Sequence, residues 1–194
     1  MRKKFITGIF VLIVIVIFMF WQKYNLDINL YIDKLKYGDE YGIEKMVTVK
    51  AHDFINRVSY DNDITHSINR VDNYFDNNCD IYLADLHYTY NKDIRSKIIE
   101  SLKHRRRPNE GLSLTIYPTR SSAKIINFDE DQVNVEVNGY FKVIHEHDYG
   151  ELDEAEELSY EYTVTFEKKF LFVWKATHFR TNSDVIKNIM NGFL

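Results

Sequence analysis

Hydrophobic and polar positions divide this chain into three parts. Residues 5–21 form an unbroken apolar run, residues 26–107 place apolar residues at helical spacing, and residues 111–181 alternate between apolar and polar positions. Spacings of three and four residues are typical of amphipathic helices, and alternation is typical of half-buried strands. The pattern predicts an apolar N-terminal helix followed by one α+β domain, residues 22–194.

The apolar run is predicted to be a single transmembrane helix. Its 17 residues, FITGIFVLIVIVIFMFW, contain no charge, and as a helix they span about 25 Å, near the lower limit for crossing a bilayer. Three basic residues, Arg2, Lys3 and Lys4, precede the run, and such residues mark the cytoplasmic side. We therefore expect residues 1–4 in the cytoplasm and residues 22–194 outside the cytoplasmic membrane.

A cleavable signal peptide is the alternative interpretation of the same run. Signal peptides have apolar cores of about 7 to 15 residues and end in small residues at the cleavage site. This run is longer, and its last four residues, FMFW, are all bulky. The pattern favours an uncleaved signal-anchor.

Helices are predicted in the first part of the domain, the helical half 26–107. They are Leu26–Tyr37, a second from Asp39, a third after Asp63 with apolar positions through Phe75, and a fourth from Asp93 that ends before Pro108. Gly38 stands where a left-handed C-terminal cap is expected. A short strand is expected within Ile81–Tyr90.

Strands are predicted in the sheet half, residues 111–181. In the stretch 133–138, VNVEVN, valines alternate with polar residues, and Tyr160, Tyr162, Val164 and Phe166 form another apolar stripe. A tight turn is expected at Glu167–Lys169, and a C-terminal helix at 183–193 with Ser183 as its cap. Helices followed by long strands predict an α+β domain in which helices pack on a curved antiparallel sheet.

Composition and charge exclude several classes of protein. The only cysteine, Cys79, allows no intramolecular disulfide and lies too far from the apolar run for a lipoprotein. The chain has 25 basic and 29 acidic residues, and 22 of the basic ones remain when the three at the N-terminus are left out. The predicted outer domain therefore has a net charge of about −7, which argues against nucleic acid as a partner. The abundance of Ile, Asn, Asp, Tyr and Lys is typical of a low-GC bacterium.

Two stretches resemble the NTF2-like superfamily. YIDKLKYGDEYGIEKMV, residues 31–47, is similar to the opening helix, Gly-Asp turn and second helix of that family. FLFVWKATHF, residues 170–179, is similar to its last hairpin, with the pair Trp174 and Lys175. The resemblance implies a cone-shaped concavity between sheet and helices, although residues 61–107 are longer than in the simplest members.

The resemblance also implies candidate residues for the cone interior. Enzymes of the family place an Asp with a Tyr or His inside the cone as acid and base. The candidates are Tyr160, Tyr162 and His178 from the sheet and His52 or Asp53 from the second helix, and Trp174 joins them as a cavity-lining or partner-binding residue. The alternative is that the tyrosines are core aromatics and the histidines lie on the surface. A filled interior argues for this alternative, whereas an open pocket with a buried Asp beside Tyr or His argues for an enzyme.

Two clusters of polar residues are candidate binding sites. His145 and His147 share one face of a strand, but a zinc site needs further ligands, so we predict a solvated strand end and no metal. The stretch Glu146–Glu157 holds seven acidic residues and lacks the pattern of a calcium-binding loop. It is predicted to be a charged hairpin connection. Its residues Glu151, Asp153 and Glu154 are candidates for binding a basic partner.

No catalytic triad, phosphate-binding loop or CxxC motif occurs in the chain. We therefore expect a membrane-anchored, non-catalytic domain that binds a protein outside the cell and needs no cofactor. The layout resembles VirB8-like components of conjugation machines, and also the TipC-type immunity proteins of Gram-positive bacteria that neutralise exported toxins. A small-ligand binder or a lyase- or isomerase-type enzyme that uses the cone stays open as the alternative.

Overall fold

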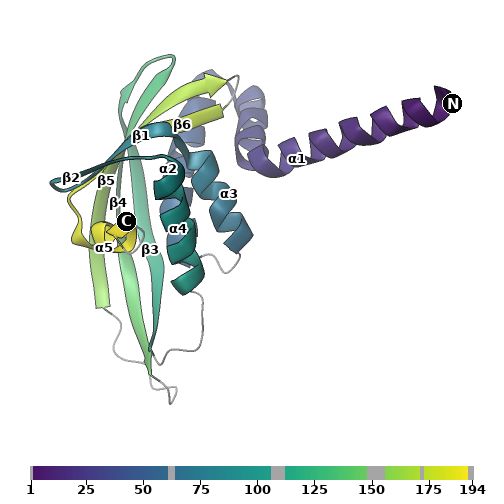
Figure 1. Cartoon of the computed structure of the whole chain (residues 1–194). Coiled ribbons are helices and arrows are strands. Elements are labelled where there is room, and N and C mark those ends of the chain that lie inside the picture. The colour runs from purple at the N-terminus through teal and green to yellow at the C-terminus, as the bar shows by residue number, and fades with distance from the viewer. Residues whose placement is uncertain (1, 61–63, 106–111, 148–155, 171–172, 192–194) are drawn as a thin grey trace.

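The computed structural model describes residues 2–60, 64–105, 112–147, 156–170 and 173–191 (Figure 1). The helices are α1 (Arg2–Tyr37), α2 (Asp39–Tyr60), α3 (Ile64–Tyr74), α4 (Lys92–Arg105) and α5 (Asp184–Asn191). The strands are β1 (Phe75–Leu83), β2 (Leu86–Thr89), β3 (Leu112–Phe128), β4 (Gln132–His147), β5 (Glu156–Phe170) and β6 (Val173–Thr181).

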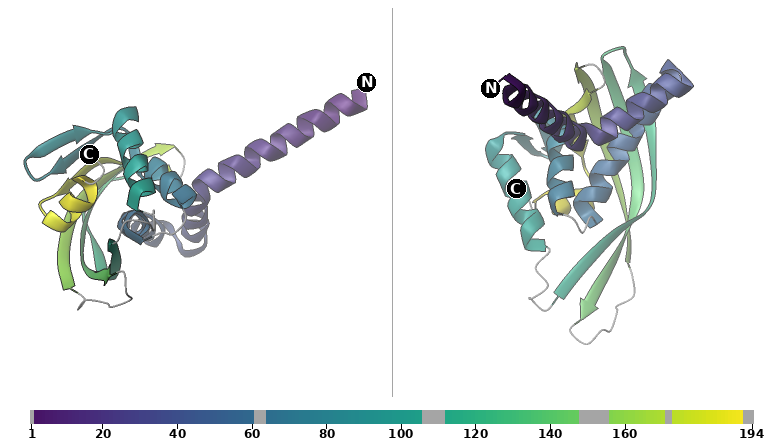
Figure 2. Two further views of the ribbon diagram at one scale, coloured as in Figure 1. Left: turned by 60° about the horizontal axis from the view of Figure 1, so that its bottom comes forward. Right: turned by 90° about the vertical axis from the view of Figure 1, so that its right-hand side faces the viewer.

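Helix α1 is one helix with a sharp bend. The backbone leaves helical geometry at Tyr24, with φ −115° and ψ 21°, and the parts Thr7–Gln22 and Asp27–Tyr37 meet at 79°. The first part points away from the domain, and the second packs beside α2 (Figures 1 and 2). The predicted apolar run and the predicted helix 26–37 are therefore two arms of one bent helix.

Among the described helices, no single one is both long enough and apolar enough to cross a membrane. The two arms of α1 pass that test only when they are counted together.

The turn between α1 and α2 has the predicted chemistry. Gly38 adopts φ +99°, a left-handed conformation that glycine enters without steric cost, and its N–H donates to the Lys34 carbonyl at 2.9 Å. Gly42 is needed for a second reason: a Cβ there would lie 2.3 Å from the Cβ of Lys34. The two glycines let α2 fold back closely along the second arm of α1.

The six strands form one sheet in the order β2-β1-β6-β5-β4-β3. Neighbours are antiparallel except β1 and β6, which run parallel. The prediction of an antiparallel sheet is therefore wrong at this one pair, and the sheet is mixed. Alternation along a strand reports which face is buried and carries no information on the direction of the neighbouring strand, so the sequence pattern could not reveal this pairing.

All five helices contribute to a core on one face of the sheet. Buried residues of α1 to α5, among them Leu30, Phe54, Tyr74, Ile98 and Ile186, join the inward residues of β1, β4, β5 and β6 in a single cluster. The opposite face is polar, as Asn134, Glu136 and Asn138 alternate with fully buried valines. Helices on one face of a curved mixed sheet are consistent with the NTF2-like cone that the resemblance implies (Figure 2).

Several predicted boundaries move in the structure. The single predicted strand is a hairpin, β1 and β2, whose turn contains Ala84 at φ +53°, and Phe75 starts β1 instead of ending α3. Helix α4 is capped by Asn91, because its side-chain oxygen accepts the N–H groups of Asp93 and Ile94 at 2.9 and 3.0 Å. Strand β5 continues through the predicted turn to Phe170.

Candidate functional site

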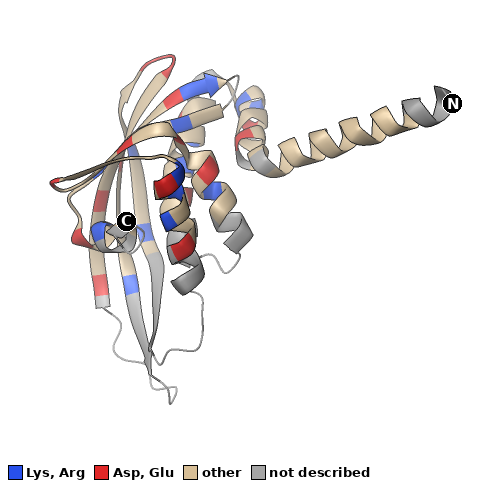
Figure 3. Ribbon diagram, viewed as in Figure 1, with Lys and Arg blue, Asp and Glu red and all other residues tan. Residues whose placement is uncertain are grey.

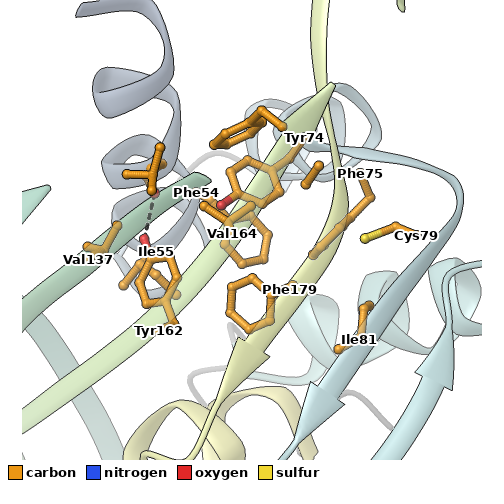
Figure 4. Close-up of a cluster of buried hydrophobic side chains, with 14 of the residues drawn as sticks. Phe54, Ile55, Tyr74, Phe75, Cys79, Ile81, Val137, Tyr162, Val164 and Phe179 are labelled. Atoms are coloured by element: carbon orange, nitrogen blue, oxygen red, sulfur yellow. Dashed lines mark hydrogen bonds between the residues drawn. The ribbon is translucent and has the colours of Figure 1, made fainter. Parts of the chain in front are cut away.

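The interior of the cone is filled with aromatic side chains (Figure 4). Phe54 of α2 stacks on Tyr74 of α3 with ring centroids 4.2 Å apart, and Tyr162 of β5 stacks on Phe179 of β6 at 5.1 Å. Phe75 packs edge-on against Phe54 at 5.0 Å. All five side chains are at most 2% exposed. The space between the helices and the sheet is occupied here by the protein's own rings.

Tyr162 uses its hydroxyl to hold α2 on the sheet. The hydroxyl donates to the Ala51 carbonyl at 2.6 Å (Figure 4). Burial, helped by the neighbouring hydroxyls of Tyr74 and Tyr160, raises the pKa of Tyr162 well above its ordinary value. A hydroxyl that is buried, bonded and hard to ionise is suited to a structural role.

Tyr160 and Trp174 are also buried, at 4% and 3% exposure. Tyr160 stacks on Phe141 with centroids 4.3 Å apart and lies across Gly139, where a Cβ would come within 2.5 Å of its ring. The absent side chain of Gly139 thus makes room for Tyr160. Both aromatic residues serve as packing on the inner face of the sheet.

His178 lies on the outer face of the sheet, away from the tyrosines. Its Nε2 is 3.7 Å from Oδ2 of Asp80, and Nε2 of His87 is 2.8 Å from Oδ1 of the same carboxylate. Tyr82 stacks on the His87 ring at 4.5 Å. These groups are partly or largely exposed, so they form a solvated polar cluster.

The predicted acid and base candidates have separate partners. Asp53 pairs with Arg70 at 3.2 Å, Tyr162 bonds to Ala51, and His178 lies beside Asp80. His52 is half-buried, and this burial lowers its pKa. The fold therefore does not assemble these candidates into a pair around a common cavity.

A buried charge cluster lies between α1, α2 and α3. Nζ of Lys50 donates to Oδ1 of Asp27 at 2.7 Å, and the two side chains are 4% and 2% exposed. Asp53 and Arg70 pair beside them. Burial lowers the pKa of Lys50, and the charge of Asp27 opposes that shift. This cluster is a candidate site because buried ionisable groups are concentrated at functional sites.

The cavity at the charge cluster is too small for a substrate. Asp27, Lys50, Asp53, Arg70 and Tyr74 line it, together with Phe54 and Asn73, and its free volume is about 10 Å³. Such a volume holds about one water molecule. The hydroxyl of Tyr74, which also lines this cavity, is buried and has no hydrogen-bond partner among the described residues.

Asp27 and Lys50 were not predicted as site residues, although the sequence contains a signal for Lys50. It lies four residues after Met46 and four before Phe54, on the face of α2 that the apolar pattern assigns to the core. A lysine at such a position needs a buried counter-charge. The identity of that partner depends on how α1 packs on α2.

Other predicted residues lie outside the described part of the chain. They are Glu151, Asp153 and Glu154, and the side chains of His145 and His147. Within the described residues, no group of three or more His, Cys, Asp and Glu side chains is placed to bind a metal ion.

No protein-family model matches the sequence, and no curated protein matches it. Among solved structures, an NTF2-like superfamily protein from Salmonella enterica is 10% identical, with a TM-score of 0.48, and covers 73% of this chain and 90% of its own. A putative scytalone dehydratase from Novosphingobium aromaticivorans is 16% identical, with a TM-score of 0.44, covering 72% and 85%. A ketosteroid isomerase-like protein from Erwinia carotovora is 10% identical, with a TM-score of 0.40, covering 70% and 91%. At these identities none of the activities in those names transfers to this chain.

Proposed function

We propose that this chain is a membrane-anchored, non-catalytic interaction domain of the NTF2-like type, held by α1 at the outer side of the cytoplasmic membrane. The observation that carries the proposal is the exposure of the first arm of α1. Every residue from Ile9 to Trp21 is a large apolar one, and their exposure runs from 43% at Phe20 to 65% at Phe10. An apolar surface of this extent marks a site of contact with lipid or protein.

The charge distribution supports a lipid environment for this arm. It carries no charged residue, while the domain has both signs of charge on its surface (Figure 3). A short apolar span is accommodated by local thinning of the bilayer. The three basic residues before it favour a cytoplasmic N-terminus and an outer domain.

The packed interior supports a non-catalytic role. The cone is filled by Phe54, Tyr74, Tyr162 and Phe179, and the charge cluster has room for about one water molecule. A small-ligand site needs a cavity of about 300 Å³ or more. For the described part of the domain, binding through its surface is therefore favoured over catalysis inside it.

Two tasks fit an anchored acidic domain: a component of a secretion or conjugation complex, and an immunity protein that captures an exported toxin. Both need a surface that attracts a protein partner, and an acidic surface speeds association with a basic one. The first task requires stable assembly with other membrane components. The second requires only that the toxin be captured when it arrives.

Cysteine labelling tests the orientation in the membrane. Cys79 is fully buried, and burial raises the pKa of its thiol, so the wild-type chain gives little background. Glu161→Cys places a thiol at an exposed position of β5, and Lys3→Cys is the matched control before the apolar run. In intact bacterial cells we expect a membrane-impermeant maleimide to label Glu161→Cys and to label Lys3→Cys only after permeabilisation.

The opposite labelling pattern contradicts the proposed orientation. Release of the chain from membranes by alkaline carbonate contradicts the anchor itself.

A further inference from the structure

Strand β5 ends in an exposed aromatic residue. Phe170, the last residue of β5, is 61% exposed, the highest value for a large hydrophobic side chain in the described part of the sheet. Lys168, two residues earlier, is also exposed. A single exposed apolar residue needs no explanation, so the significance of Phe170 depends on where the end of β5 lies.

The end of β5 lies beside the bend of α1. Figures 1 and 2 both show the end of β5 next to the place where the first arm of α1 leaves the domain, and α1 contacts β6. The β1–β2 turn with Leu86 lies on the opposite side of the domain (Figure 1). If the first arm of α1 crosses a membrane, the side of the domain at the bend faces that membrane.

The charges at this end suit the headgroup region of a bilayer. Nζ of Lys169 neutralises two acids, Glu167 at 2.8 Å and Asp76 at 3.0 Å, and Figure 3 shows basic residues at the end of β5. The remaining charge of Lys168 can meet lipid phosphates while its methylene chain lies against apolar groups. The acidic turn after β3, with Asp129, Glu130 and Asp131, neighbours β5 through the bond from Lys168 N to Asp131 O, but it lies farther from α1 in Figure 1.

We infer that the end of β5 is a second membrane contact, in which Phe170 enters the lipid interface and Lys168 binds headgroup phosphates. The inference rests on the proposed function, since it needs α1 in the membrane. A single anchoring helix does not by itself fix which side of the domain faces the bilayer. A second contact holds the domain in one orientation and turns its opposite side, with the β1–β2 turn, toward a partner.

An environment-sensitive fluorophore at position 170 tests this contact. The full chain with Phe170→Cys is labelled with nitrobenzoxadiazole (NBD) and reconstituted into vesicles of phosphatidylcholine and phosphatidylglycerol. Leu86→Cys is the matched control, because Leu86 is an apolar residue with 45% exposure on the side away from α1. At position 170 we expect emission shifted to shorter wavelength and a loss of intensity when lipids carry a nitroxide near the headgroup. At position 86 we expect neither change.

Flotation of the vesicles together with the fluorescence at position 170 distinguishes failure of the second membrane contact from failure of the α1 anchor. If the chain floats with the vesicles while position 170 behaves like position 86, the second membrane contact is overturned and the anchor stands. If the chain does not float, the anchor is overturned and the second membrane contact with it.

Lys168→Glu on the Phe170→Cys chain is expected to reduce the quenching. Lys142→Glu, at an exposed position of β4 that pairs with Glu157 near the start of β5, is expected to leave the quenching unchanged, and equal effects of the two exchanges overturn the role of Lys168.

Discussion

At the scale of single residues, the pair of Lys50 and Asp27 joins the bent helix to the domain. Both charges are almost completely removed from water, which costs free energy that their mutual attraction offsets only while both are present. The pair therefore favours the observed packing of α1 on α2 over arrangements that bury only one of the two charges.

Removal of one partner is predicted to be far more harmful than removal of both. Lys50→Met leaves the Asp27 carboxylate buried without its counter-charge, and we expect a loss of about 3–5 kcal/mol in the free energy of unfolding. The double variant Asp27→Leu with Lys50→Met is expected to recover most of that loss. Urea unfolding of the full chain in detergent micelles at pH 7 measures both. A single variant within about 1 kcal/mol of the wild type would contradict a buried pair.

The same pair predicts a dependence of stability on alkaline pH. Because burial lowers the pKa of Lys50 from its ordinary 10.5, the folded chain releases this proton at a lower pH than the unfolded chain does. The contribution of Lys50 to the free energy of unfolding therefore rises with pH from the lowered pKa up to 10.5. The double variant lacks this contribution, so the difference between wild type and double variant should grow through that range.

At the scale of elements, the start of α4 shows that a local pattern can predict a helix and still misplace its first residue. Asp93 and Asn91 are both good capping residues, and only the backbone geometry selects between them. Asn91 Oδ1 accepts two N–H groups, while Asp93 lies in the first turn. There its charge interacts with the helix dipole.

Substitution of the cap should therefore cost more than substitution in the first turn. We expect Asn91→Ala to lower the free energy of unfolding by about 1 kcal/mol, and Asp93→Ala, the matched control at an exposed position, by only about 0.3 kcal/mol. Urea denaturation followed by circular dichroism compares the two. An equal or larger effect at Asp93 would assign the cap to that residue.

At the scale of the whole molecule, the proposed partner binding should depend on the acidic stretch 146–157. Reversal of Glu151, Asp153 and Glu154 to lysine removes the charges expected to attract a basic partner. Reversal of Asp129, Glu130 and Asp131 is the matched control, with the same change in net charge. We expect capture of a partner by the tagged full chain, quantified by mass spectrometry of detergent extracts, to fall only for the first variant and to weaken with salt. Equal capture by both variants would exclude the acidic stretch as the binding surface.

Much of the architecture is readable from local pattern. Apolar spacing in residues 39–74 and 93–102 predicts helices that the structure contains, and alternation at 133–138 assigns the valines to the core and their polar neighbours to the outer face. These features follow from the period of each element, which a short window of sequence contains. Phe75 and Asp93 mark the limit of such windows, because an element's end depends on neighbours that the window omits.

The sequence by itself determined the apolar run, the α+β order of elements, the Gly38 turn and the inner face of β4 and β5, since each depends on residues close together in the chain. Only the tertiary structure decided the parallel pairing of β1 with β6, the filling of the cone by Phe54, Tyr74, Tyr162 and Phe179, and the meeting of Lys50 with Asp27. These last features join residues far apart in sequence. Their identity depends on how whole elements pack, because a buried group is satisfied by whichever partner the fold brings to it.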